Sequence, residues 1–260
     1  NKYSASELVI ECRDKAVKMT IGRNNASFVD KKDSDAITTL IGNHVGLSSD
    51  VTATSVQHSK LTQYYSSDWD FMVSRAEVNG LLVVPDDGKV AVKAPDVSSS
   101  ALLTVTFGDS MISFDADMDA ISQLKATEAD YWDVTSQAIG NSTGSDPSVN
   151  AQGNITGTTL SDVASPTSYK LQSPAILASD DAKAWADSAL LKSRLAKIRG
   201  TVSFQGNAKP KPNTIIELVT ESMARENIVI PVDVQGEAVV IAMHNPNNID
   251  VLDKLRFMLN

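Results

Sequence analysis

Cysteine is almost absent from this sequence, since Cys12 is the only one among 260 residues. No disulfide can form within the chain, which is consistent with folding in a reducing compartment. No apolar run approaches the roughly 20 residues that a membrane-spanning helix needs, so we expect no membrane insertion. A signal-peptide pattern is also missing at the start. Because the first residue is Asn1 rather than Met, we expect a fragment that lacks its true N-terminus.

The chain also lacks a surplus of positive charge. It carries 23 Lys and Arg against 32 Asp and Glu, which gives a formal net charge of −9. A phosphate backbone is bound by a basic surface, and no dense run of Lys and Arg is present, so we expect no nucleic-acid partner. The remaining composition, 42% hydrophobic and 21% charged, is typical of a globular protein. The length suffices for two modest domains or one large β-rich domain.

The most clearly patterned stretch is residues 61–92, which we predict to form a capped helix followed by a β-hairpin. Ser66 or Ser67 can cap the helix, and Gly80 can end it, because glycine takes the left-handed C-terminal conformation at little cost. One apolar stripe recurs at helical spacing, made of Trp69, Met72, Val73 and Ala76. Two short apolar runs follow, joined by a Pro-Asp-Asp-Gly turn. This unit contains no nucleophile paired with a base, so it is interpreted as scaffold.

Other segments give weaker signals of an α+β, β-rich protein. Residues 3–22 alternate as strands do, residues 28–47 are expected to contain a short helix, and a longer helix is expected at 180–198. Residues 101–107 and 111–118 favour strands, and the runs 201–204 and 214–219 favour a strand pair. Residues 140–168 are dominated by small polar side chains, and we expect a long mobile loop there. The tail favours a helix, two strands near 228–232 and 238–243, and a last helix.

Two groups of polar residues are possible metal sites. His44 and His58 have no carboxylate at ligand spacing, so we expect no metal there and interpret His44 as a surface loop residue. The series Asp115, Asp117 and Asp119 lacks the glycine and glutamate that complete a calcium loop. On a strand these carboxylates would share the solvent face. The core face would then hold Phe114, Ala116, Met118 and Ala120.

The remaining candidates are also better explained by structure than by chemistry. Cys12 is expected to be a small buried apolar residue. Asp70 and Glu77 are the only carboxylate pair worth testing for a wall-cleaving hydrolase, and both suit a solvated helix face better. His244 is interpreted as a turn residue at a strand end. The sequence therefore assigns no catalytic, cofactor-binding or metal-ligating residue, and we expect that the protein is not an enzyme and carries no cofactor.

A family resemblance is carried by the run Gln63–Phe71 (QYYSSDWDF) and its continuation Arg75–Leu81 (RAEVNGL). Together with the segment Gly200–Gly206, these residues resemble the hub proteins of contractile injection systems, over about residues 1–218. The family comprises the VgrG spike protein of type VI secretion and the late control protein D group of tailed phages. One departure is Ser66, which stands where a glutamate is common in that family.

The last part of the chain, residues 219–260, shows a different resemblance. The runs Ala224–Pro231 (ARENIVIP) and Val239–Pro246 (VVIAMHNP) are similar to part of the N-terminal domain of type II secretion and type IV pilus assembly ATPases. Some such domains bind cyclic di-GMP, but the Arg-Leu-Gly repeats of the binding site are not present here. A natural fusion, a spliced sequence and coincidence all remain open as explanations.

The first resemblance implies a domain order and a function. The implied parts are remnant strands of a preceding barrel (1–22), an α/β hub domain with an inserted helix–hairpin unit (23–95), a β-barrel-like tube domain (96–218) and a small αββα tail (219–260). The implied function is a structural hub that adapts the tube to the spike as a homotrimer. Its partners would be the tube protein and spike or baseplate components. It would assemble in the bacterial cytoplasm and be delivered outside on contraction, or belong to a virion tail. The second resemblance implies an alternative, a regulatory nucleotide-binding module.

Overall fold

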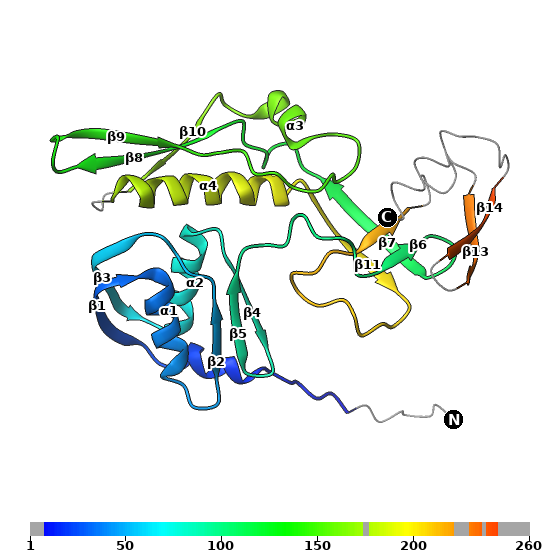
Figure 1. Cartoon of the computed structure of the whole chain (residues 1–260), viewed down its shortest axis with the longest axis horizontal. Coiled ribbons are helices and arrows are strands. Elements are labelled where there is room, and N and C mark those ends of the chain that lie inside the picture. Colours follow the sequence, from blue (N-terminus) through cyan, green and yellow to red (C-terminus); the bar gives the residue numbers. More distant parts are fainter. Residues whose placement is uncertain (1–7, 174–176, 221–228, 236–237, 244–260) are drawn as a thin grey trace, which may run out of the picture. The chain divides into compact units, whose positions relative to one another are not determined.

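The computed structural model describes residues 8–173, 177–220, 229–235 and 238–243, and its contacts group the chain into two units. The first unit contains the chain up to Val97 together with Asp119–Lys197, and the second contains Ser98–Met118 and the chain from Ile198 onward (Figure 1). The structure is α+β and rich in strands, as predicted. Its described strands form sheets of two or three strands, and none of these sheets closes into the predicted barrel.

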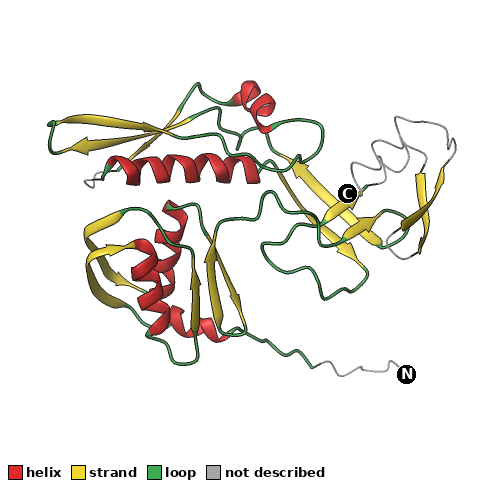
Figure 2. Cartoon of the chain, in the orientation of Figure 1, coloured by secondary structure: helices red, strands yellow, loops and turns green. Residues whose placement is uncertain are grey.

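The first part of unit 1, from residue 15 to residue 93, is called the N-terminal body below. Its elements are η1 (Lys15–Thr20), β1 (Asn24–Lys32), α1 (Asp33–Gly42), β2 (Ser48–Val51), β3 (Gln57–Ser66), α2 (Asp68–Val78), β4 (Leu82–Asp86) and β5 (Lys89–Lys93). Strands β1 and β3 pair as an antiparallel ribbon, and β2, β5 and β4 form a second sheet in that order. Helices α1 and α2 lie between the two sheets (Figure 2). The fully or nearly fully buried core is made of Ala16, Met19, Ile37, Leu40, Ile41, Met72, Ala76, Val90 and Val92.

The predicted helix–hairpin is confirmed in α2, β4 and β5. The hydroxyl of Ser67 accepts a hydrogen bond from the backbone N–H of Asp70 at 3.1 Å, which caps α2. Gly80 ends the helix region with a φ of +66°. The hairpin turn is Asp87-Gly88, with φ values of +49° and +83°, as a type I′ turn requires. Pro85 lies within β4, an edge strand, where its missing N–H is tolerated.

The strands predicted over residues 3–22 are wrong where the chain is described. Residues 15–20 form the 3-10 helix η1, because the carboxylate of Asp14 caps it by accepting the backbone N–H of Ala16 at 2.7 Å. Ala16 and Met19 then share one face of η1 and are buried in the core. Cys12 precedes this helix and is exposed, so the prediction that it is buried was wrong.

The second part of unit 1 is a helix packed along a small sheet. Its elements are β8 (Thr127–Asp133), β9 (Ala138–Thr143), α3 (Gly157–Ala164), β10 (Tyr169–Gln172) and α4 (Ser179–Leu195). The strand order is β10-β8-β9, with β10 parallel and β9 antiparallel to β8. A separate small core, of Ala129, Ala182 and Ala186 with Tyr131, Leu171 and Trp185 packed around it, joins α4 to the sheet (Figure 1). The sheet and α4 are together called the α4 layer below.

The segment 140–168, expected to be a long mobile loop, contains the end of β9 and the whole of α3. Two buried cations of α4 and its C-terminal extension hold it. Arg194 Nε donates to Asp146 at 2.7 Å, and Lys197 Nζ donates to the backbone carbonyl of Ile155 at 2.8 Å and to that of Gln152. Composition did not predict this order, because the anchoring side chains come from a different part of the sequence.

The described part of unit 2 contains three strand pairs. Its strands are β6 (Thr104–Thr106), β7 (Met111–Met118), β11 (Ile198–Phe204), β12 (Glu217–Val219), β13 (Val229–Gln235) and β14 (Ala238–Met243). Strand β11 pairs antiparallel with β7, and β12 pairs parallel with β6. The predicted pairing of the runs 201–204 and 214–219 with each other was therefore wrong. Strands β13 and β14 form an antiparallel pair, and the two helices predicted in the tail lie outside the described residues.

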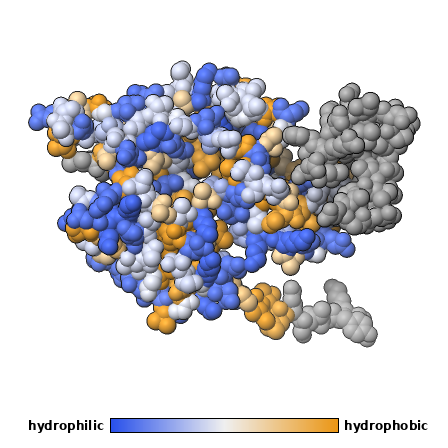
Figure 3. Space-filling view, in the orientation of Figure 1, coloured by the Kyte–Doolittle hydropathy of each residue, from blue (hydrophilic) through white to orange (hydrophobic). Residues whose placement is uncertain are grey.

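The predicted core face of β7 is exposed in the described residues. Phe114 is 41% exposed and Met118 44%, although both alternate with Asp115 and Asp117 as predicted. The alternation is correct, but β7 and β11 form a two-stranded ribbon, and no described part of the chain covers its apolar face. Figure 3 shows hydrophobic side chains reaching the surface in several patches among hydrophilic ones.

Candidate functional site

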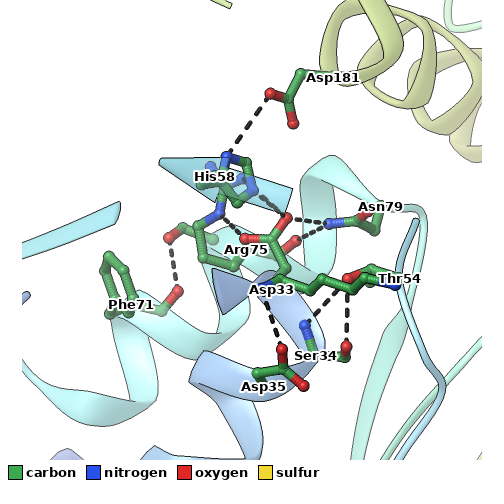
Figure 4. A network of polar contacts seen from close by, with 11 residues as sticks. Asp33, Ser34, Asp35, Thr54, His58, Phe71, Arg75, Asn79 and Asp181 are labelled. Carbon is green, nitrogen blue, oxygen red and sulfur yellow. Dashed lines mark hydrogen bonds and ion pairs between the residues drawn. The ribbon is translucent and has the colours of Figure 1, made fainter. Parts of the chain in front are cut away.

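A cluster of charged side chains gathers where β3, α1, α2 and α4 approach one another. Asp33 is the first residue of α1 and is 1% exposed. Arg75 of α2 donates to both of its carboxylate oxygens, from Nε at 2.5 Å and from Nη2 at 2.9 Å. The amide of Asn79, one turn further along, donates to the same carboxylate at 2.9 Å (Figure 4). The carboxylate of Asp33 thereby joins the two helices of the N-terminal body.

His58 of β3 lies between Asp33 and a second carboxylate. Its Nε2 atom is 3.2 Å from Oδ2 of Asp33, and its Nδ1 atom is 3.7 Å from Oδ2 of Asp181. Asp181 stands in the first turn of α4, so the histidine connects the N-terminal body to the α4 layer. Figure 4 shows the imidazole ring between Asp181 and the Arg75–Asp33 pair. The side chain of His58 is only 13% exposed.

The two carboxylates have pKa values shifted in opposite directions. Burial alone would raise the pKa of Asp33, but the hydrogen bonds and charge of Arg75, with help from Asn79 and His58, hold it below its ordinary value. Burial raises the pKa of Asp181, and the opposing charges of His58 and Arg75 only reduce that rise. The ionised form of Asp33 is therefore stabilised, whereas the ionised form of Asp181 is destabilised by burial.

Three of these residues also have the side chains of a possible metal site. Asp33, His58 and Asp181 are residue types that bind zinc, and one donor atom from each lies within 4.8 Å of the others. However, the guanidinium of Arg75 already occupies Asp33 and lies 3.4 Å from Nε2 of His58. The two ring nitrogens of His58 also face different carboxylates rather than one point. The arrangement is therefore an ion bridge through a histidine.

The other predicted site histidine, His44, also has a carboxylate partner. Its Nε2 atom lies 2.8 Å from Oδ2 of Asp68, the first residue of α2. Asp68 also accepts from the amides of Gln63 and Asn24, each at 2.9 Å. His44 lies in the loop after α1, as predicted, but it is half-buried, and this network ties it to the start of α2. Both histidines have carboxylate neighbours that sequence spacing could not reveal, since the partners lie far away in sequence.

The remaining sequence candidates do not converge in the described residues. Asp70 and Glu77 are both exposed on α2, and Glu77 pairs instead with Lys192 at 3.2 Å. Asp115 and Asp117 lie exposed on β7, with Arg199 opposite Asp117 in the ladder. His244 lies outside the described residues.

Trp69 is the aromatic residue of the predicted helix stripe, and it is half-buried against the main core. Its outer side lines an open hollow of about 130 Å³, together with Asp14, Ala16, Val17, Thr20 and Pro85. Asp14 is the one ionisable group among these lining residues, and its carboxylate accepts the backbone N–H groups of Ala16 and Gly88. Trp69 therefore packs as scaffold and does not stand beside a set of converging ionisable groups.

Comparison with known families assigns the chain to a family, which the geometry alone does not do. The family described as the Alg8 N-terminal domain matches residues 1–220. The chain belongs to this family. Beyond the Alg8 N-terminal domain, the family described as the MshEN domain matches residues 204–260, which agrees with the second resemblance predicted for the tail. A search among curated proteins gave no match. The narrower resemblance to VgrG stays a prediction.

Two solved structures similar to this Alg8 N-terminal domain are described as tail proteins. The 43 kDa tail protein of prophage MuSo2 from Shewanella oneidensis is similar with a TM-score of 0.59 and 11% identity, over 82% of this chain and 64% of that one. The tail protein from Neisseria meningitidis MC58 is similar with a TM-score of 0.54 and 11% identity, over 86% of this chain and 64% of that one. The chain thus has the fold of these tail proteins and spans just under two thirds of their length. In the described ranges every helix is too short or too polar to cross a membrane.

Proposed function

We propose that the chain is a structural component of a bacterial contractile injection machine, of the type VI secretion or phage-tail kind. It would act as a hub that adapts the tube to the spike. The observation that carries this proposal is the fold shared with prophage tail proteins over more than four fifths of the chain. The charged clusters described above are consistent with it, because their side chains hold helices and strands together. We propose that the protein acts without catalysis and without a cofactor.

The proposed assembly is a homotrimer that also contacts the tube protein and spike or baseplate components. The surface of unit 2 supports self-association. An isolated two-stranded ribbon is marginally stable in water, and the β7–β11 ribbon leaves Ile112, Phe114 and Met118 between 41% and 75% exposed. Apart from one bridge between Met111 and Phe107, both outer edges of the ribbon are also unpaired in the described residues. A ring of identical subunits covers such faces by repeating one contact around a closed axis.

The mass in solution tests the trimer. Light scattering should give three times the chain mass of 27.8 kDa. Phe114→Glu should reduce this mass toward that of one chain, because it places a charge on the apolar face of β7. Ser113→Glu is the matched control, since the neighbouring side chain points to the opposite face of the strand. A single-chain mass for the parent protein, or equal effects of the two variants, would contradict this assembly.

The proposed location follows from the proposed machine. The subunit would assemble in the bacterial cytoplasm and be delivered outside on contraction, or it would form part of a virion tail.

A second candidate function, a regulatory nucleotide-binding module, is favoured by the MshEN match at residues 204–260. Cyclic di-GMP at one hundred times a binding constant would stabilise a binding protein by about 2.7 kcal/mol, which a thermal shift detects. We expect no shift, because the Arg-Leu-Gly repeats are absent from the tail. A saturable shift would favour the regulatory function instead.

A further inference from the structure

We propose that residues 8–12, called the N-terminal arm below, dock in the hollow beside Trp69 of a second copy of this chain. The proposal rests on the proposed function, because it assigns one contact of the self-association described above. It joins two features that the proposed function does not use. One is an exposed apolar segment, and the other is an open hollow lined mostly by apolar side chains.

The N-terminal arm carries an unusual exposed apolar run. Leu8, Val9 and Ile10 are 83%, 80% and 72% exposed. Nowhere else in the described residues are three consecutive large apolar side chains exposed in this way. Figure 3 shows the run as a hydrophobic patch at the end of the described chain. Contiguous exposed apolar side chains of this kind mark an interaction site.

The arm has one apolar side and one charged side. Residues 8–14 form no helix and pair with no strand in the described part of the chain. Arg13 Nε donates to Glu11 at 2.8 Å, so these two side chains lie on the same side of the backbone. In an extended chain, alternation then places the opposite side chains together, namely those of Leu8, Ile10 and Cys12. The arm can therefore bury its apolar side while its charges stay in water.

The hollow has the size and the lining to receive one of these side chains. Its volume is about 130 Å³. An apolar cavity of about 150 Å³ holds benzene, which is similar in size to a leucine or isoleucine side chain. Beside Trp69, the lining contains Ala16, Val17 and Pro85. The carboxylate of Asp14 also lines the hollow, but it accepts two backbone N–H groups, so its charge is already compensated.

The geometry favours the hollow of a second copy over the hollow of the same chain. Asp14 has the extended φ and ψ values of −63° and 155°, and the arm runs away from η1 as the dark blue trace in Figure 1. Four extended residues place Ile10 about 13 Å beyond Asp14. A return would require a tight turn, and residues 11–13 contain no Gly, Pro or Asn to favour one. A second copy can offer its hollow without any change in the arm.

The contact is head-to-tail, because the arm and the hollow are different surfaces of the chain. Each copy gives its arm to the next copy and receives the arm of the previous one. A contact of this kind closes into a ring when the rotation between neighbours closes. Three copies of the proposed hub would then be joined by three identical arm contacts.

Disulfide trapping in the full chain tests this contact. Cys12 is the only cysteine, is exposed and lies in the arm. Thr20→Cys adds a second thiol at the exposed rim of the hollow. A disulfide needs Cα atoms within about 7 Å, so mild oxidation should link arm and rim between chains only if the arm docks there. We expect linked species of up to three chains in a denaturing, non-reducing gel.

Two controls set the background of this experiment. The parent chain has one cysteine and cannot link more than two chains. Tyr64→Cys also adds an exposed thiol, at a position that is 84% exposed and outside the lining of the hollow, and should give no linked species of three chains. In the Thr20→Cys background, the pair Leu8→Asp and Ile10→Asp should lower the yield of linked chains by about tenfold or more, because burial of two aliphatic side chains is lost. Val9→Asp, on the charged side of the arm, should keep the yield.

The arm contact is overturned if Thr20→Cys links chains no better than Tyr64→Cys, or if its disulfide forms within one chain. It is also overturned if the double aspartate variant keeps the yield of the Thr20→Cys chain. Light scattering separates this result from the proposed trimer. A trimer mass without the disulfide would overturn the arm contact alone. The disulfide between chains, together with a mass of two chains, would support the arm contact and contradict the trimer.

Discussion

Arg75 binds both carboxylate oxygens of Asp33 across 42 positions of sequence, in a pair of which the aspartate side chain is 1% exposed. The planar guanidinium suits this geometry, since its N–H groups point in parallel at the two oxygens. The pair joins the start of α1 to the last turn of α2, and residues of both helices belong to the main core. The position and orientation of the two helices therefore depend on this ion pair as well as on the apolar core.

Removing the arginine should strongly destabilise the N-terminal body. Arg75→Met leaves Asp33 buried with Asn79 and His58 as its remaining partners, and breaking a buried pair in this way costs about 3–5 kcal/mol. The free energy of unfolding in urea measures the loss. Arg13→Met is the matched control, because Arg13 pairs with Glu11 on the surface and such pairs contribute at most about 1 kcal/mol. Similar losses for both variants would show that the buried pair has no special role.

Acid should weaken the same contact. The pKa of Asp33 is lowered in the folded protein, so its contribution to stability is complete above the ordinary value of about 3.9 and is lost as the pH falls through the lower folded value. Asp68 acts in the same direction: burial alone would raise its pKa, but hydrogen bonds from Gln63, Asn24 and His44 hold it below its ordinary value. The unfolding midpoint in urea should fall below about pH 4, and less steeply in Asp33→Asn. An equal slope in the two proteins would contradict this assignment.

The turn between β4 and β5 should reject a side chain. At Gly88 the φ is +83°, and a Cβ atom would lie 2.9 Å from the carbonyl oxygen of Gly46. We expect Gly88→Ala to lower the stability by about 1–3 kcal/mol, since both the backbone conformation and the space oppose it. Gly42, near the end of α1, has open space and no positive φ. Thermal unfolding should show no loss for Gly42→Ala, whose helix propensity is better.

Lys197 should control the order of residues 146–157. Its ammonium is buried, donates to two backbone carbonyls of this segment, and has a pKa lowered by burial. In Lys197→Met those carbonyls lose their donor, so amide hydrogen exchange over the segment should become faster at a fixed pH. Lys170→Met removes an exposed lysine of the same layer and should leave this exchange unchanged. Unchanged protection in Lys197→Met would mean that Arg194 is enough to hold the segment.

The parts of the fold that were predictable from sequence are those that local signals determine. The helix and hairpin of residues 61–92 carry a capping serine, an apolar stripe, and glycines at two of the positions with a positive φ, and each of these acts within a few residues. Strand pairing was not predictable in this way. Strand β11 pairs with β7 and not with its neighbour in sequence, because pairing depends on which edges tertiary packing brings together.

The cluster of Asp33, His58, Arg75 and Asp181 was not predicted from the sequence, for a related reason. No spacing rule connects His58 with Asp33 on α1 or with Asp181 on α4, since the three residues lie on separate elements. The available signal was an acidic residue in the first turn of each helix, Asp33 in α1 and Asp181 in α4, where a carboxylate also suits the helix dipole. Because the first turn of each helix is buried near β3, the carboxylates of Asp33 and Asp181 both become partners of His58.

The backbone N–H of Asp119 donates to the carbonyl of Lys197 at 3.1 Å, directly beside the ends of β7 and β11. The chain therefore departs from the ribbon and comes back to it at almost the same point, after an excursion of residues 119–197. An inserted segment of this kind can be lengthened, shortened or exchanged during evolution without disturbing the pairing of β7 with β11. We therefore expect members of this family to differ widely in residues 119–197 and still retain the β7–β11 ribbon.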